Sequence, residues 1–143
     1  MLKLIPPILS PDLLHVIASM GHGDELVLGD ANFPCDALAK RIVHADGHSI
    51  PRLLDAILRY YPLDDFVECP VALMDNGDAA NRPPIWQEYS KCILRHEGDR
   101  HVELVDRFAF YDRAKEAYAV VATGETALYG NVILKKGVVS MED

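Results

Sequence analysis

The sequence predicts an α/β domain in which helices cover a central sheet. The chain has 143 residues, of which 50% are hydrophobic, and this suits one compact domain, residues 1–143, with a core of its own. Segments with helical spacing of apolar residues alternate with short apolar runs that are typical of buried strands. The sequence contains no long linker, internal repeat or low-complexity tract, so we expect no second domain.

The helix predictions rest on apolar periodicity and on residues that start or stop a helix. Ser10 can cap the first helix, with Pro11 at its first position and Gly21 as its stop. Pro62 closes the second helix, and Gly98 stops the third. The expected helices cover residues 11–20, 50–60, 85–97 and 107–117.

The strand predictions rest on short apolar runs that are bounded by turn residues. "ELVLG" and "CPVALMD" are such runs, and "NGDAANRPP" after the second has the composition of an exposed loop. "YAVVATG" ends in a glycine turn, and "YGNVILKKG" is expected to form the last strand. The expected strands lie within residues 25–29, 41–45, 69–75, 101–106, 118–124 and 129–137.

The charge balance excludes several classes of partner. The formal net charge is −8 and the longest basic run is Lys135–Lys136, so neither nucleic acid nor an anionic membrane is an expected partner. A small neutral molecule fits better. No apolar stretch approaches the ~20 residues that span a bilayer, and the early prolines do not suit a signal peptide. The three widely spaced cysteines form no CxxC pair, so we expect a cytoplasmic protein with reduced thiols.

His22 and Asp30 stand at the two ends of the "ELVLG" strand. His22 lies just past the first helix, where the negative end of the helix dipole and Asp24 favour an imidazolium that can donate a proton. Asp30 lies at the carboxyl end, where α/β proteins gather ligand-binding groups. The plain alternatives are a solvated turn histidine and an ordinary turn aspartate. An extended run would separate the two residues by about 20 Å, so one chain alone is not expected to join them.

The C-terminal third carries a second polar cluster. Arg107 and Tyr111 are four residues apart, so they can present a cation and a phenol on one helical face. Tyr129, Gly130 and Asn131 form a turn that offers an aromatic plate, a free amide and a carboxamide to a polyol. The alternatives are an ion pair with a neighbouring carboxylate for the arginine and an edge-of-core aromatic for Tyr129.

His44, Asp46 and His48 alternate as metal ligands on one strand face would. The intervening "ADG" is a turn signal, which favours a strand end followed by a helix cap at Ser49 over a metal site. A metal-dependent hydrolase built on the two histidines stays as a lesser alternative. The sequence carries no Gly-x-Gly-x-x-Gly, Walker loop or Gly-x-Ser-x-Gly motif for a nucleotide site or a serine hydrolase.

Four stretches together resemble a known family. "GHGDELVLGDANFP", "HADG", "RFAFYDRAKEAYAVV" and "TGETALYGNVILKKG" are similar to the family of L-fucose mutarotases and D-ribose pyranases, and the resemblance runs from "IPPILSPDLL" almost to Gly137. It implies a single three-layer α/β/α domain with a central mixed sheet. It also implies an isomerase that interconverts the α and β anomers of a free monosaccharide with no cofactor and no metal.

The resemblance assigns roles to the polar residues. His22 matches the proton donor, and Tyr111 stands where fucose-active relatives place a further phenol, so these two are the expected catalytic residues. Tyr129 or a bound water remains an alternative base. The implied substrate-binding residues are Asp30, Arg107, Tyr129, Gly130 and Asn131. Ribose pyranases of similar length carry histidine at the position of Arg107, so L-fucose is preferred to ribose as the expected substrate.

The resemblance also implies an assembly. Relatives form ring-shaped homo-oligomers, often decamers, with sugar pockets at subunit boundaries. His22 and the Tyr129 turn would then come from different chains, which agrees with the separation expected along the strand. The alternatives for function are a D-ribose pyranase-type activity and a noncatalytic monosaccharide-binding module.

Overall fold

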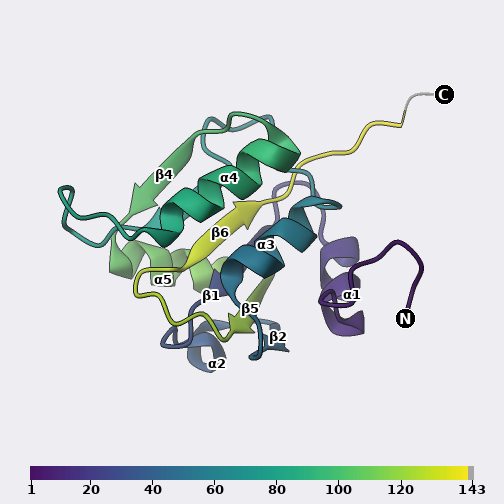
Figure 1. Ribbon diagram of the computed structural model, residues 1–143, viewed down its shortest axis with the longest axis horizontal. Helices are drawn as coiled ribbons and strands as arrows, with labels where there is room; N and C mark the ends of the chain where they lie inside the picture. Colours follow the sequence, from purple (N-terminus) through teal and green to yellow (C-terminus); the bar gives the residue numbers. More distant parts are fainter. Residues whose placement is uncertain (142–143) are drawn as a thin grey trace.

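The computed structural model describes residues 1–141 and contains one six-stranded sheet flanked by five helices (Figure 1). The strands are β1 (Glu25–Gly29), β2 (Ile42–Ala45), β3 (Val71–Met74), β4 (Val102–Val105), β5 (Ala119–Thr123) and β6 (Val132–Lys135). The helices are α1 (Pro11–Ser19), α2 (Cys35–Leu38), α3 (Ile50–Leu58), α4 (Ile85–Glu97) and α5 (Arg107–Glu116).

The sheet is mixed because one strand runs against all the others. The strand order is β2-β5-β1-β6-β3-β4, and β6 is antiparallel to both of its neighbours, β1 and β3. The remaining neighbours pair in parallel. Leu28 near the end of β1 is paired with Val132 at the start of β6. The turn that leads into β6 therefore lies at the carboxyl ends of β1 and β3.

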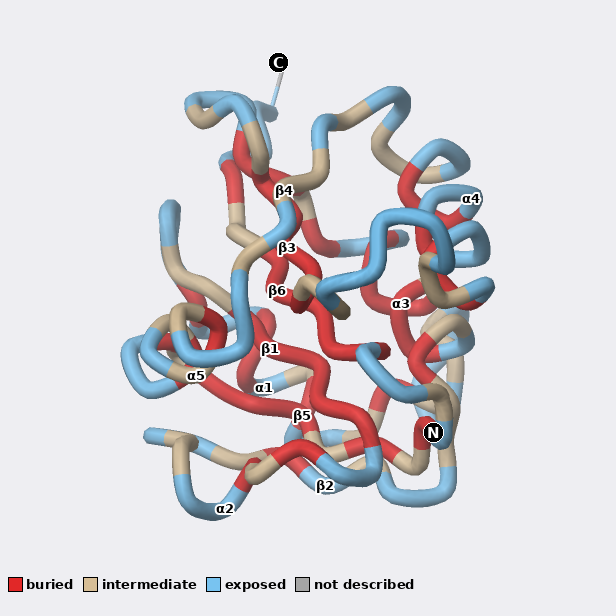
Figure 2. The backbone as a smooth tube through the Cα atoms, turned by 90° about the vertical axis from the view of Figure 1, so that its left-hand side faces the viewer, coloured by how far each residue is buried: buried red, intermediate tan, exposed pale blue. Residues whose placement is uncertain are grey.

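Helices cover both faces of the sheet. In β1, Leu26 and Leu28 belong to the core cluster under α1, α3 and α4, whereas Val27 belongs to the cluster under α2 and α5. This division follows from the alternation of side chains along a strand. Figure 2 shows the inner strands β5, β1, β6 and β3 as the buried centre of the chain between exposed helix faces. The expected three-layer α/β/α arrangement with a mixed sheet is confirmed.

Ser10, Ser49 and Gly98 stand at helix ends as expected, although the Ser49 side chain forms no capping hydrogen bond. Ser10 Oγ accepts a hydrogen bond from the Leu13 amide at 3.2 Å, and Gly98 ends α4 with a φ of +77°. The second helix stops at Leu58 rather than Tyr60, because the chain forms a turn before Pro62. The four-residue helix α2 was not predicted, since four residues are too few for apolar periodicity. No helix within residues 1–141 is long and apolar enough to cross a membrane.

Candidate functional site

A cavity of about 310 Å³ opens at the carboxyl ends of β1 and β3. Its walls come from the segment after β1, the end of β3, the start of α5 and the turn before β6. The lining residues are Asp30, Asn32, Phe33, Met74, Arg107, Tyr111, Leu128, Tyr129 and Asn131. Five of the seven sequence-predicted site residues therefore line one cavity, and Gly130 belongs to the same turn.

Asp30 is the buried carboxyl group of this cavity, with 5% of its surface exposed. Its amide donates to Asn131 Oδ1 at 2.7 Å, and its Oδ1 accepts from the Asn32 amide at 2.9 Å. Burial raises the pKa of the Asp30 carboxyl, and the hydrogen bonds from nearby backbone amides offset only part of that effect. Asp30 is thus a carboxyl group that hydrogen bonds hold in place and whose charged form is disfavoured by burial.

Arg107 and Tyr111 meet on one face of α5 as their spacing predicts. Arg107 Nε donates to Tyr111 Oη at 3.0 Å, one helical turn further along the chain. Asp106 is occupied as the cap of α5, where its carboxylate accepts from the amides of Phe108 and Ala109. Among residues 1–141 Arg107 forms no ion pair, because Glu103 is bound to Arg113 instead. The guanidinium and the phenol are therefore presented to the cavity together.

The turn before β6 has an unusual backbone that helix α4 holds in place. Tyr129 has a φ of +55°, in the left-handed region that non-glycine residues avoid. Its carbonyl oxygen accepts from Trp86 Nε1 at 2.9 Å, and the carbonyl oxygen of Gly130 accepts from Tyr89 Oη at 2.7 Å. Sequence reasoning missed both α4 side chains. The apolar periodicity of α4 indicates burial of one helix face and no more, so it does not single out either residue.

His22 lies at the opposite end of β1 and does not line the cavity. Its Nε2 is 3.0 Å from Asp64 Oδ1, and its ring centroid is 5.1 Å from that of Phe66. Burial alone would raise the pKa of Asp64, but hydrogen bonds from the Phe66 amide and the His22 ring outweigh it and lower the pKa below its ordinary value. An ionised carboxylate only accepts hydrogen bonds, so His22 Nε2 carries a hydrogen.

Asp64 was also missed, because a contact across 42 residues leaves no spacing signal in the sequence. The structure thus divides the expected site into two parts within one chain. We call the His22, Asp64 and Phe66 group the histidine group, and the residues around Asp30 the cavity. His22 and Asp30 lie at opposite ends of β1.

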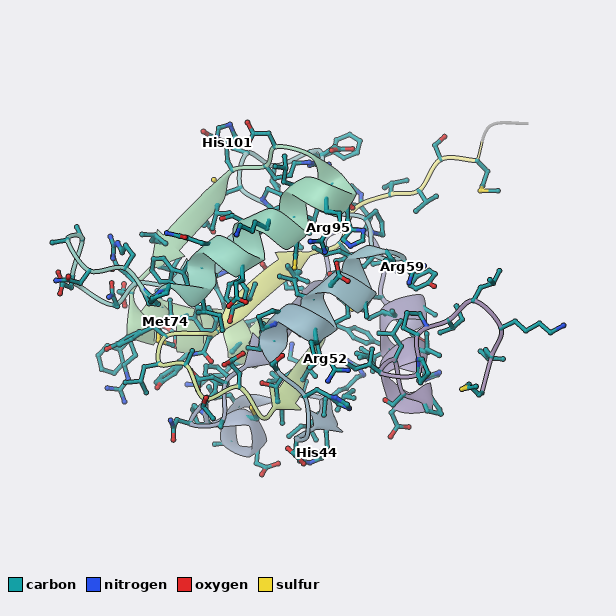
Figure 3. The ribbon with its side chains drawn as sticks, in the orientation of Figure 1. His44, Arg52, Arg59, Met74, Arg95 and His101 are labelled. Atoms are coloured by element: carbon teal, nitrogen blue, oxygen red, sulfur yellow. The ribbon has the colours of Figure 1, made fainter. Side chains whose placement is uncertain are left out.

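The alternative metal site gains no support from the geometry. His44 Nδ1 lies 3.4 Å from Asp46 Oδ2, and both side chains are mostly exposed. Figure 3 shows His44 beside β2, well away from Met74 of the cavity. Within residues 1–141 no group of three or more His, Cys, Asp or Glu side chains is arranged to hold a metal ion.

Comparisons with known proteins give one family over nearly the whole chain. Residues 3–139 match the RbsD / FucU transport protein family. The fucose mutarotase of Danio rerio is 52% identical, over 99% of this chain and 97% of its own length. The crystal structure of the fucose mutarotase in complex with L-fucose from Streptococcus pneumoniae has a TM-score of 0.93 at 48% identity, covering 97% of this chain and 100% of that one.

A solved structure with lower sequence identity has a similar fold. The structure of Bacillus subtilis RbsD complexed with D-ribose has a TM-score of 0.71 at 25% identity, covering 98% of this chain and 100% of that one. Both the curated relative and the solved structures span this chain almost from end to end. The chain therefore belongs to the RbsD / FucU family.

Proposed function

We propose that this chain is an isomerase that interconverts the α and β anomers of L-fucose by opening and closing the sugar ring. The observation that carries the proposal is the cavity, which joins a buried carboxylate, a guanidinium, two phenols and a carboxamide in about 310 Å³. These groups suit the hydroxyls of a monosaccharide. The likeness to a fucose mutarotase solved with L-fucose supports the same conclusion.

The apolar part of the cavity supports a 6-deoxy sugar. Phe33, Met74 and Leu128 line the cavity beside its polar groups. L-Fucose carries a methyl group where other hexoses carry a hydroxymethyl group, and a methyl group gains free energy on leaving water for an apolar wall. The five-carbon sugar ribose has no such methyl group, and so we propose L-fucose as the preferred substrate.

We assign the proton transfers as follows. His22 of a neighbouring copy donates a proton to the ring oxygen, and the bond from this oxygen to the anomeric carbon breaks. A base takes the proton of the anomeric hydroxyl, which becomes the aldehyde oxygen; Tyr111 is proposed as this base, with Tyr129 and a bound water as alternatives. Rotation of the aldehyde and the reverse transfers give the other anomer. Acid–base catalysis of this kind contributes about 10² to 10⁴-fold.

Asp64 supports this role of His22. Because the Asp64 carboxylate accepts from Nε2, the nitrogen left to donate to a sugar is Nδ1 of the protonated ring. The buried position of Asp64, with 4% of its side chain exposed, keeps the imidazole in one orientation. The groups proposed to bind the sugar lie in the cavity and in the turn beside it: Asp30, Arg107, Tyr129, Gly130 and Asn131.

The division of the site supports an assembly. We propose a ring-shaped homo-oligomer, a decamer, in which the histidine group of one chain faces the cavity of another. We also propose a cytoplasmic location, because the three cysteines are free and two of them are buried.

Exchange NMR on L-fucose tests the proposed function. With the full chain added, saturation of the α-anomer signal is expected to transfer to the β-anomer faster than in buffer alone. D-Ribose and D-galactose serve as comparison sugars. Binding of L-fucose without faster exchange would select the noncatalytic sugar-binding module, and faster exchange of ribose alone would select the pyranase-type activity.

Sugar affinity is expected to fall on acidification at a higher pH than an ordinary aspartate would give. The ordinary pKa of 3.8 is raised for Asp30 by burial, and protonation removes an acceptor of sugar hydroxyls. The effect of Asp30 on the stability of the fold has the opposite pH dependence, since its contribution is larger at low pH. A carboxyl whose pKa is raised on folding stabilises the fold below the unfolded pKa, and this contribution is lost as the pH rises through the folded pKa.

The Asp30→Asn variant separates the two effects. It is expected to bind L-fucose about 10-fold or more weakly at neutral pH, because a hydrogen bond to a charged group is lost. Its affinity should no longer fall on acidification, because the variant has no carboxyl group to protonate at this position. Calorimetric titration at a series of pH values measures the affinity, and thermal unfolding measures stability. An acid decline that persists in the variant would assign the titration to another group.

A further inference from the structure

Two side chains of α4 determine the position of the cavity turn without lining the cavity. Trp86 Nε1 donates to the carbonyl oxygen of Tyr129, and Tyr89 Oη donates to that of Gly130. Neither donor belongs to the cavity lining. We infer that Trp86 and Tyr89 are positioning residues that set sugar affinity through the turn 129–131. This inference rests on the proposed function for its kinetic readout, but not for its structural one.

The strained backbone at Tyr129 is the first argument. Within residues 1–141, Tyr129 and Leu4 are the non-glycine residues with a positive φ. Such a conformation persists only where surrounding contacts hold it, and it gathers at ligand-binding sites. At Tyr129 the indole N–H supplies such a contact, 2.9 Å from the carbonyl oxygen of the strained residue itself. Loss of this donor removes a reason for the turn to keep its shape.

Close packing at Gly130 is the second argument. A Cβ atom at Gly130 would lie 3.0 Å from the carbonyl oxygen of Ala127 and 3.2 Å from Tyr89 Oη. The phenol therefore contacts the backbone of the turn with almost no spare space. Burial, together with the nearby charges of Glu125 and Asp30, raises the pKa of Tyr89 far above its ordinary value. The phenol therefore stays protonated near neutral pH, where it donates to the turn.

The turn passes its position on to the binding groups. Asn131 follows Gly130, and its Oδ1 accepts from the Asp30 amide at 2.7 Å. On the other side, Glu125 holds the start of the same loop, with its carboxylate accepting from the amides of Ala127 and Ile50 at 3.1 and 3.0 Å. A shift of the turn therefore moves Tyr129 and Asn131 relative to Asp30. These three side chains are among the groups proposed to form hydrogen bonds with the hydroxyl groups of the sugar.

Tyr89→Phe is the test, and Tyr61→Phe is its matched control. Both tyrosines are 1% exposed, and each phenol donates to a backbone carbonyl, that of Gly130 at 2.7 Å or that of Leu134 at 2.9 Å. Both variants are expected to lower the unfolding temperature to a similar extent. Only Tyr89→Phe is expected to raise the KM for L-fucose, about three- to tenfold, which corresponds to one hydrogen bond. Its kcat at saturating sugar should stay within about twofold, since sugar binding restores the turn.

Hydrogen exchange gives a readout that needs no sugar. The amides of residues 126–132 are expected to exchange faster in Tyr89→Phe and in Trp86→Phe, which keeps an aromatic ring but loses the indole N–H, and to be unchanged in Tyr61→Phe. Saturating L-fucose should restore their protection. Equal KM and equal exchange in Tyr89→Phe and Tyr61→Phe would overturn the inference. A wild-type protein that neither binds nor isomerises L-fucose would overturn the proposed function, while the exchange of residues 126–132 would still decide the positioning role.

Discussion

Replacing His22 by alanine is expected to lower accelerated anomer exchange by about 10² to 10⁴-fold, because it removes the proposed acid. The fold should survive, since 44% of the His22 side chain is exposed and its contacts are with Asp64 and Phe66 rather than the core. L-Fucose should still bind, because the variant keeps the proposed binding groups that line the cavity. Exchange NMR measures the rate, and calorimetric titration measures the affinity.

His15→Ala is the matched control for this variant. His15 is also an exposed histidine of the N-terminal region, on the surface of α1. Its removal should leave both the exchange rate and the affinity unchanged. Undiminished exchange in His22→Ala would exclude this imidazole as the acid, and lost exchange with an altered fold by circular dichroism would return His22 to a structural role.

Mixing two inactive variants is expected to restore activity. His22→Ala keeps an intact cavity, and Asp30→Ala keeps an intact histidine group, and the two lesions lie at opposite ends of β1. If each site is shared between chains, random assembly of equal amounts gives about one site in four with both parts intact. The two variants are mixed, dissociated and allowed to reassemble. Exchange NMR should then show about a quarter of the wild-type rate, because about a quarter of the sites are intact.

Each variant taken through the same procedure alone is the control for mixing. Neither should gain activity, because every site then carries the same lesion. A mixture that stays as inactive as its components, in mixed oligomers confirmed by mass spectrometry, would show that each site is built from one chain. A dilute monomer with full activity would lead to the same conclusion.

Local sequence signals predicted most of the fold. Helix α1 begins at Pro11 behind the Ser10 cap, and α4 ends at Gly98, because these signals act within a few residues. The position of β6 between β1 and β3 could not be read in this way. Its pairing joins Leu28 to Val132, and hydrophobic runs do not record which strand is the neighbour or in which direction it runs.

The site residues likewise divide into those that local sequence signals predict and those whose role depends on a distant contact. Arg107 and Tyr111 were predictable as a pair, because their helical spacing alone brings them together. Asp30 and Asn131 were each predicted as binding residues from their local position, at a strand end and in a turn, but their contact across 101 residues could not be read from spacing. Asp64 and Trp86 escaped sequence reasoning because their importance depends on a distant partner, the His22 ring in one case and the Tyr129 carbonyl in the other.

The antiparallel course of β6 has a consequence for the distance between the cavity and the histidine group. β6 begins beside Asn131 at the cavity. Its other end is bonded to the segments that carry the histidine group: Lys135 O accepts from the Asp64 amide at 3.0 Å, and Lys136 O accepts from the Gly23 amide at 2.8 Å. The four residues of β6 thus set the distance between the cavity and the histidine group. Loops elsewhere can lengthen or shorten without altering this span, whereas a single insertion into β6 would change the distance between the cavity and the histidine group.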